Sequence, residues 1–474
     1  MKISIDGKSF TLVGEETEEH MRQVAEYIDQ KMTEIRQKAV AVTLDSSLAY
    51  VLTSINVADD YFKEKAYTAE TATKTYNKQQ YKQIIGNEFA ILRTSEKAKG
   101  KTTRELFEML EEQMNIKELT WIPLSSKAYI EVNNEYMLAL YEDGSIKEEE
   151  IKVLDISNGS IDLKSNGYIQ GQWTVQGSGY GTKYTVSGEF VENVGAYIIT
   201  GTSTKNFVRV LEAGTYDIII NDLNIDVSDK GYTCAFNANR NKKASGVNVN
   251  LHIEGDNVLR SGASSAGLGF AGALPNLNGE TSGSVLTMQG NGNLYVEGGH
   301  YSAAIGSGYT GPDSAQGDAN NIIINSGNIT AKSGSSYAAA IGGGLRKNAN
   351  NIVINGGNIN AICTSHGVGI GATGSSGNGI AKGIVINGGF LVVEGRDEGA
   401  IGGEQGSEAV QINGGKLTLK NTGKLSVLGD NCSSVILAGG TIIANSAKGS
   451  GIGTVDLTKN INITRKKEHQ NGKG

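Results

Sequence analysis

The sequence contains few cysteines and lacks two kinds of hydrophobic segment. Its three cysteines, Cys234, Cys363 and Cys432, are odd in number and match no metal-binding spacing. No apolar segment follows Met1, and no run approaches the ~18 apolar residues of a membrane-spanning helix. We therefore expect reduced, packed thiols, no metal site, no membrane span and a cytoplasmic location.

The chain also lacks the positive charge that nucleic-acid binding requires. Its formal net charge is −7, which gives no general electrostatic footprint for a phosphate backbone. The basic run Arg465-Lys466-Lys467 is interpreted as part of a solvated polar tail over residues 461–474. We expect no nucleic-acid partner.

Glycine, in contrast, is abundant, and it recurs within a repeated phrase. Glycine accounts for 64 of 474 residues, about twice the ordinary usage. Four near-copies of Ile-Asn-Gly-Gly place their asparagines 30, 32 and 26 residues apart, at Asn325, Asn355, Asn387 and Asn413. A β-rich phrase that recurs at this interval is typical of a stacked-repeat protein rather than a closed globular domain.

Each phrase contains the parts of one coil of a parallel β-helix. A β-branched triplet such as Ile352-Val353-Ile354 leads into the Asn-Gly corner, and a second strand such as Asn358–Ala361 follows at once. A small-residue element such as Ala340-Ile341-Gly342 lies between copies. One coil cannot bury its own apolar face, whereas stacked coils can. The pattern predicts about eight coils over residues 166–460, a rod on the order of 40 Å long at ~4.8 Å per coil.

The recurring asparagines are interpreted as a structural ladder. Stacked amides at a β-helix corner hydrogen bond to one another and to the backbone, and so satisfy buried polar groups along the rod. A ligand-binding row is the alternative. The ladder comprises Asn325, Asn355, Asn387 and Asn413.

The second half of the chain resembles known β-helix proteins. Over residues 170–460 it is similar to the glycine-rich repeats of surface and adhesin-like proteins of Gram-positive gut bacteria, and the stretches 197–203 and 216–227 resemble the opening coils of carbohydrate-binding, pectin-lyase-like β-helices. Pectinolytic members carry clustered aspartates with a nearby Arg or Lys, or Asn-Thr-Asp and Gly-His-Gly motifs, and neither set is present. We expect no catalytic residues, no cofactor and no enzymatic activity.

The amino-terminal end follows a different pattern. Alternation around Asp6-Gly7 predicts a β-hairpin. Thr17 then precedes an amphipathic helix, with apolar residues at Met21, Val24, Ile28, Met32 and Ile35. A second helix carries apolar residues in steps of three and four, which are heptad positions and predict self-association. These oligomerisation residues are Leu48, Val51, Ile55, Ala58 and Phe62.

Three blocks of this end resemble the ZapA family, cytoplasmic proteins that bind and cross-link filaments of the bacterial division protein FtsZ. The blocks are Gly7–Leu12, Tyr27–Met32 and Leu48–Lys63, and they occur in the family's order and spacing. The resemblance covers residues 1–66, a head and the start of the family's long helix. It implies a head that dimerises, a coiled coil that promotes dimers or tetramers, and an FtsZ-like filament protein as partner.

The remaining segments connect these two halves. Residues 67–118 are expected to form a helical linker, in which Thr102 and Glu105 make a capping box. Residues 119–165 are expected to form a small strand-rich connector or cap. The predicted fold is multidomain: a small α+β ZapA-like head (1–66) with a long helix, followed by an all-β, single-stranded parallel β-helix (166–460) and the tail (461–474).

Two functional hypotheses follow. In the first, the chain is a non-enzymatic assembly protein of the division septum, whose head self-associates and binds FtsZ filaments and whose β-helix is a rigid spacer or partner platform. In the second, the β-helix binds polysaccharide, as an adhesin-like module at the cell surface, and the head only multimerises it.

Overall fold

The structure is a computed structural model that describes most of the 474 residues. The described residues are 2–11, 18–38, 47, 49–57, 60, 76–124, 127–133, 135–149, 151–176, 183–192, 194–239, 246–272, 283–310, 317–374, 379–396, 398–403, 405–423, 427–428, 435–446, 456–457 and 462–466. The chain divides into two compact units, Met1–Ile84 and Ile85–Gly474.

The first unit begins with the predicted hairpin. Strands β1 (Lys2–Ile5) and β2 (Lys8–Thr11) pair antiparallel. Asp6 and Gly7 take positive φ values of 52° and 71°, which are the backbone angles of a tight type I′ turn. Helix α1 (Glu18–Lys38) follows, and the residues described at 47, 49–57 and 60 are also helical.

The buried face of α1 differs from the predicted one. Ala25, Met32 and Ile35 are buried, whereas Val24, which was expected on the inner face, is exposed. Met21 and the expected N-cap Thr17 lie outside the residues whose side chains are described. The apolar stripe is therefore rotated toward Ala25.

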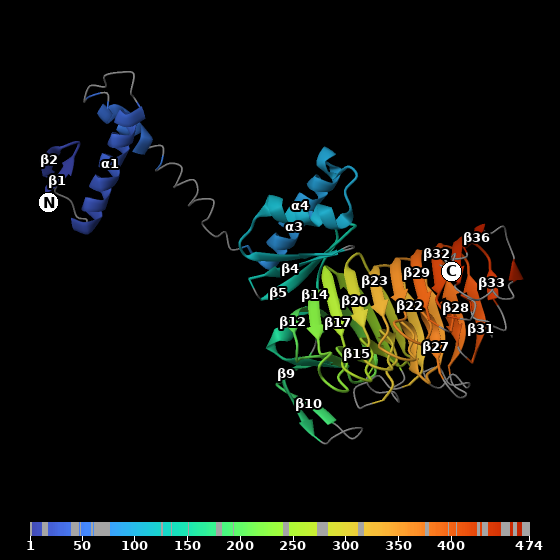
Figure 1. Ribbon diagram of the computed structural model, residues 1–474. Coiled ribbons are helices and arrows are strands. Elements are labelled where there is room, and N and C mark those ends of the chain that lie inside the picture. Colours follow the sequence, from blue (N-terminus) through green and yellow to red (C-terminus); the bar gives the residue numbers. More distant parts are fainter. Residues whose placement is uncertain are drawn as a thin grey trace, which may run out of the picture. The chain divides into compact units, whose positions relative to one another are not determined.

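The second unit opens with a small helical and antiparallel cap, shown beside the first coils in Figure 1. Its helices are α3 (Lys78–Thr94), which crosses the boundary between the units, and α4 (Thr103–Met114), joined through a short 3₁₀ turn at Glu96–Ala98. The capping box of Thr102 and Glu105 is present at the start of α4, as predicted. A four-stranded sheet completes the cap: β3 (Leu119–Pro123), β4 (Lys127–Val132), β5 (Tyr136–Tyr141) and β6 (Ile146–Glu148).

The cap is packed on the outer face of the first coils. Tyr129, Met137 and Ala139 of the cap sheet form one buried cluster with Ile198 and Ile219 of the solenoid. An ion pair of 3.0 Å joins Arg104 Nη1 to Glu254 Oε2, whose side chain has no exposed surface. Since an unpaired buried carboxylate is costly, this pair ties the cap to the rod.

The solenoid consists of coils with three strand faces, and the strands of successive coils lie side by side (Figure 1). Face 1 contains β7 (Ile151–Asp155), β12 (Ala196–Ser203), β14 (Gly214–Asp226), β16 (Val247–Glu254), β19 (Val285–Gly290), β22 (Ala319–Ile324), β25 (Ala349–Ile354), β28 (Ile380–Ile386), β31 (Gly406–Ile412), β33 (Val435–Leu437) and β35 (Asp456–Leu457).

The other two faces repeat the same parallel pairing. Face 2 contains β17 (Asp256–Arg260), β20 (Asn293–Glu297), β23 (Asn328–Lys332), β26 (Asn358–Ile362), β29 (Phe390–Gly395), β32 (Lys416–Asn421), β34 (Thr441–Ser446) and β36 (Asn462–Lys466). Face 3 contains β8 (Ser160–Lys164), β13 (Val208–Val210), β15 (Phe236–Asn239), β18 (Leu268–Phe270), β21 (Ile305–Gly306), β24 (Ile341–Leu345), β27 (Ile370–Thr373) and β30 (Ile401–Gly403).

A separate antiparallel extension leaves face 3 near its start. It comprises β9 (Gly167–Gln176), β10 (Lys183–Ser187) and β11 (Phe190–Glu192), with β9 paired to β8. At its base Trp173 packs on Tyr184 and Phe207. The extension therefore has an aromatic anchor of its own.

The core is a continuous apolar column inside the coils. In one coil it is formed by Ile352 and Ile354 of face 1, Ile359 and Ala361 of face 2, and Ile370 of face 3, each at most 1% exposed. The same positions in the next coil lie directly in register. Each coil thus buries its apolar side chains mainly against its neighbours, as a solenoid requires.

The Asn-Gly-Gly corner is imposed by backbone geometry. Gly357 and Gly389, the second glycines of their corners, have φ values of +97° and +98°. A Cβ on Gly356 would lie 2.8 Å from the carbonyl oxygen of Asn325 in the preceding coil. The stacked corners therefore approach too closely for a larger residue.

The rod extends beyond the predicted 166–460 at both ends. Strands β7, β8 and β12 pair in parallel with later coils, so coils begin at Ile151, within the segment predicted as a connector. Strand β36 pairs with β34, so Asn462–Lys466 adds a strand to face 2 within the segment predicted as a polar tail. The sequence did not indicate these end coils because they lack the Asn-Gly-Gly corner. The eleven described strands of face 1 correspond to a length of about 50 Å.

Candidate functional site

The head contains a polar cluster built from two of the three blocks that were singled out in the sequence. Tyr27 Oη donates a hydrogen bond to Asp60, and Lys31 Nζ lies 2.9 Å from the same carboxylate. The hydrogen bond to Asp60 raises the pKa of Lys31. Because Asp60 lies 29 or more residues from its partners, the cluster fixes the second helix against α1.

A second contact fixes the hairpin to the same helix. The Asp6 backbone N–H donates to Asp29 Oδ1 at 2.6 Å, and Arg36 Nη2 lies 2.7 Å from Asp6 Oδ2. Asp6 therefore holds the hairpin turn to α1 through both its backbone N–H and its side-chain carboxylate. At about 100° per residue the two contacts lie on opposite sides of α1, with Tyr27 and Lys31 on one side and Asp29 and Arg36 on the other.

Two of the five predicted oligomerisation residues are described, and both are exposed. The exposed fraction is 54% for Val51 and 58% for Ile55, and Leu52 beside them is also exposed. Leu48, Ala58 and Phe62 lie outside the described residues. An apolar helix surface of this kind is available for another chain. Self-association through it stays a prediction.

The four corner asparagines are joined in one row. Asn355 Nδ2 donates to Asn325 Oδ1 at 2.8 Å, Asn387 to Asn355 at 2.7 Å, and Asn413 to Asn387 at 2.7 Å. Their side chains are exposed (Asn355, Asn387) or half-buried (Asn325, Asn413), and they hydrogen bond to one another as the predicted ladder requires. That they also satisfy buried groups stays a prediction. The row ends because Ala438 occupies the next corner. These amides use one another as partners.

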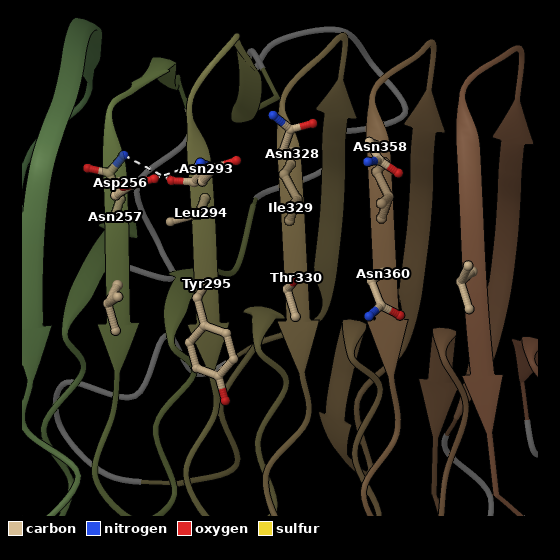
Figure 2. Close-up of a pocket in the computed structure, with 13 residues that line it drawn as sticks. Asp256, Asn257, Asn293, Leu294, Tyr295, Asn328, Ile329, Thr330, Asn358 and Asn360 are labelled. Carbon is tan, nitrogen blue, oxygen red and sulfur yellow. Dashed lines mark hydrogen bonds between the residues drawn. The ribbon is translucent and has the colours of Figure 1, made fainter.

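A groove runs across face 2, and the sequence analysis assigned no role to its residues. It encloses 590 Å³ and crosses five successive coils (Figure 2). Its lining is rich in side-chain amides: Asp256, Asn257, Val258, Asn293, Leu294, Tyr295, Asn328, Ile329, Thr330, Asn358, Ile359, Asn360 and Val392. We call it the asparagine groove.

Register explains the lining of the asparagine groove. Asn293, Asn328 and Asn358 occupy the same position of β20, β23 and β26, and Tyr295, Thr330 and Asn360 occupy the position two residues later. Positions two apart on a strand point to the same side of a sheet. The groove is thus lined by two parallel rows of mainly polar side chains, with one side chain of each row on each coil.

A row of ion pairs borders the asparagine groove. Arg260 lies 3.3 Å from Asp226 and 3.5 Å from Glu297, and Lys332 lies 2.9 Å from Glu297. Tyr295 Oη also donates to Glu297 at 2.9 Å. Burial alone raises the pKa of Glu297, but hydrogen bonds from Lys332 and Tyr295 outweigh it and the pKa is lowered. Glu297 therefore stays ionised at neutral pH.

Beyond this row lies a second hollow of 560 Å³. Hydroxyl groups line it, from Ser228, Ser261, Ser333, Ser335 and Thr364. His300 Nδ1 lies 2.7 Å from Ser335 Oγ. The two hollows and the ion-pair row make one polar surface along the rod.

Other site chemistry is sparse. No group of three or more His, Cys, Asp or Glu side chains that might hold a metal ion occurs among the described residues. In the same part of the chain, no helix combines the length and the apolar character needed to cross a membrane. Cys234 and Cys363 are buried thiols that form no disulfide within the described part of the chain, and Cys432 lies outside it.

The sequence contained a signal for the asparagine groove that was not used. Asn328 and Asn358 recur directly after the corner glycines, just as Asn325 and Asn355 recur before them. Sequence spacing cannot separate a ladder from a groove, because both have one asparagine per coil. The side-chain hydrogen bonds separate them.

Comparison with known proteins places the amino-terminal end. The family model described as "Cell division protein ZapA" matches residues 1–114. The Cell division protein ZapA of Bacillus pumilus is 46% identical over 63 residues, which are 13% of this chain and 72% of that protein. That of Bacillus subtilis is 48% identical over 61 residues, 13% of this chain and 69% of that protein.

A further relative extends the comparison, and the structures add none. The Cell division protein ZapA of Bacillus thuringiensis is 40% identical over 65 residues, 14% of this chain and 71% of that protein. No solved structure matches the chain. Through its amino-terminal end, the chain belongs to the ZapA family of cell division proteins.

Proposed function

We propose that this chain is a non-enzymatic assembly protein of bacterial cell division. Its head self-associates and binds filaments of FtsZ, and its solenoid is a rigid spacer or partner platform. The observation that carries the proposal is the ZapA match, which covers most of the length of the relatives. The proposed location is the cytoplasm at the division site.

Exposure in the head supports self-association. Val51, Leu52 and Ile55 place three large apolar side chains on the surface of one unit. Exposed apolar surface of this kind is stabilised by burial against a partner, at roughly 25 cal/mol per Å² of apolar area. A second copy of the same helix buries both surfaces at once.

The repeat architecture supports a passive role for the rod. Successive coils contact one another through parallel strand pairs on three faces, so the solenoid resists bending between its ends. Two solenoids attached to one self-associated head then present two copies of the same surface. Such paired presentation increases effective affinity for any repeating partner.

Co-sedimentation with polymerised FtsZ tests the proposal. Full-length protein is expected to pellet with the polymer, and the Val51→Asp/Ile55→Asp double variant to sediment as a smaller species and pellet about tenfold less, because bivalent attachment is lost. Val175→Asp is the matched control, since Val175 is 48% exposed on β9 outside the head. Wild-type protein that self-associates but leaves the polymer unbound contradicts the proposal.

A further inference from the structure

The asparagine groove differs in its hydrogen bonding from the corner ladder on the same coils. The ladder amides donate to one another from coil to coil. In the groove, Asn293 donates to Asp256 at 2.6 Å and Asn328 to the Asn291 carbonyl at 3.3 Å, and no hydrogen bond joins Asn328 to Asn293 or Asn358. The groove asparagines therefore form no amide-to-amide ladder, although they stand in register on successive coils.

One groove amide is left without a partner. Asn360 Oδ1 is buried and accepts no hydrogen bond from the protein. Figure 2 shows Asn360 on β26 beside Thr330 of β23. An unsatisfied acceptor is costly, and rotation of the Asn360 amide toward the groove would let a ligand hydroxyl reach it.

The charges of this surface exclude a polyanionic ligand. The cations Arg260 and Lys332 are already paired with Asp226 and Glu297. Asp256 adds a third carboxylate, which holds the Asn293 amide. Three carboxylates against two cations leave no positive site, so a chain of acidic groups is repelled.

The spacing of the groove disfavours a peptide. Same-side residues of an extended peptide recur about every 6.8 Å, whereas coils are about 4.8 Å apart. The groove also lies on a sheet face, whose backbone groups are paired to both neighbouring strands, so a peptide cannot add as a strand. One sugar ring of an extended glycan is close to one coil in length.

We propose that the asparagine groove binds a neutral polysaccharide lying along the rod, with about one sugar per coil. Side-chain amides both donate and accept, as sugar hydroxyls do. Phe390, in register with Asn358 on the next coil and 64% exposed, offers an aromatic surface for the apolar face of a sugar ring. Several shallow contacts repeated along one chain suit a polymer better than a small molecule.

Affinity electrophoresis of full-length protein tests this inference. Native gels contain one of three neutral probes (laminarin, barley β-glucan or soluble starch) or the anionic probe polygalacturonate. At least one neutral glucan is expected to retard the protein. The Asn328→Ala/Asn358→Ala/Asn360→Ala variant is expected to bind about tenfold more weakly, because three polar contacts are removed.

A matched control separates the groove from the rest of the rod. Lys382→Ala/Glu408→Ala removes an exposed ion pair of 3.1 Å on face 1 and is expected to bind as wild type. Thermal unfolding of each variant checks that the coils remain folded. Retardation by no neutral glucan, equal retardation of the triple variant, or stronger retardation by polygalacturonate overturns the inference.

A peptide ligand is the remaining outcome. Selection of groove-dependent peptides from a displayed library, with no glucan retained, would assign the groove to a protein partner and overturn the inference. The asparagine groove lies within residues 256–392, apart from the head. The result is therefore independent of whether the head binds FtsZ.

Discussion

The head and the solenoid specify their structures in different ways. The head is identified by particular residues at particular positions, such as Tyr27, Lys31 and Asp60, which meet in one cluster. The solenoid is specified by a period, and many of its positions tolerate any β-branched residue. Relatives can therefore be recognised from the head sequence, whereas the fold of the rod is indicated by the regular spacing of its Asn-Gly-Gly corners.

The same difference predicts which parts of the structure a substitution destabilises. A head substitution acts on one polar cluster or one apolar surface. A coil substitution acts on two neighbouring coils, because each coil is stabilised mainly by the interfaces above and below it. The comparison is sharpened by substitutions that break one region and leave the other intact.

The largest effect is expected from Gly371→Ala. Gly371 has a φ of +137°, and a Cβ there would lie 1.9 Å from the carbonyl oxygen of Gly402 in the next coil. We expect the free energy of unfolding of the rod to fall by more than about 3 kcal/mol, because the coils must separate. Urea unfolding followed by circular dichroism measures it.

Gly231→Ala is the matched control for this substitution. A Cβ on Gly231 would have no atom within 4 Å, so its unfolding is expected to match wild type. Self-association of the Gly371→Ala protein, measured by sedimentation velocity, is expected to persist. Loss of self-association with an intact rod would show that the two regions are not independent.

A smaller effect is expected from Asn355→Ala in the corner ladder. Asn355 bonds to both Asn325 and Asn387, so its removal breaks two side-chain hydrogen bonds. Each such bond contributes about 0.5–1.5 kcal/mol net, so the rod is expected to lose about 1–3 kcal/mol. Asn325→Ala, which breaks one ladder bond, is expected to lose about half as much.

Equal losses for these two variants would contradict a ladder whose energy is carried by its bonds. Differential scanning calorimetry gives both values under one condition. Binding of neutral glucan is expected to be unchanged in both variants, because the ladder and the asparagine groove use different amides. That second measurement separates the two rows of asparagines.

The parts of the fold that sequence predicts are those fixed by local chemistry. The hairpin turn at Asp6-Gly7 and the capping box at Thr102 and Glu105 depend on residues within three or four positions, and both are present. The coil pattern is also local, since a β-branched run and a glycine corner occur within ten residues. Because the same pattern recurs, one local prediction applies to every coil that carries it.

What the sequence did not predict depends on contacts between coils. Asn325 and Asn328 are three residues apart and recur with the same period, yet one bonds to its counterpart in the next coil and the other does not. The end coils were missed for a related reason. Strand β7 pairs with β12 through backbone hydrogen bonds. Almost any residue type can make these bonds, so the sequence does not reveal the pairing.

The smallest effect is expected at the junction of cap and rod, where His252 lies. Burial lowers the pKa of His252 below 6.5, the charge of Lys127 lowers it further, and Asp217 opposes both. Its Nε2 lies 3.1 Å from Nε2 of Gln289. The folded protein therefore favours the neutral ring, and the unfolded chain binds more protons at mildly acid pH.

The sign of the pH dependence follows from this lowered pKa. The contribution of neutral His252 to stability is complete above pH 6.5 and is lost as the pH falls from 6.5 through the folded pKa. Thermal unfolding at pH 8 and pH 5 is expected to show a smaller acid loss in His252→Gln than in wild type. Equal losses in the two proteins would contradict it. A loss confined to the cap, seen as faster hydrogen exchange in β4 and β5, would show that the cap opens before the coils.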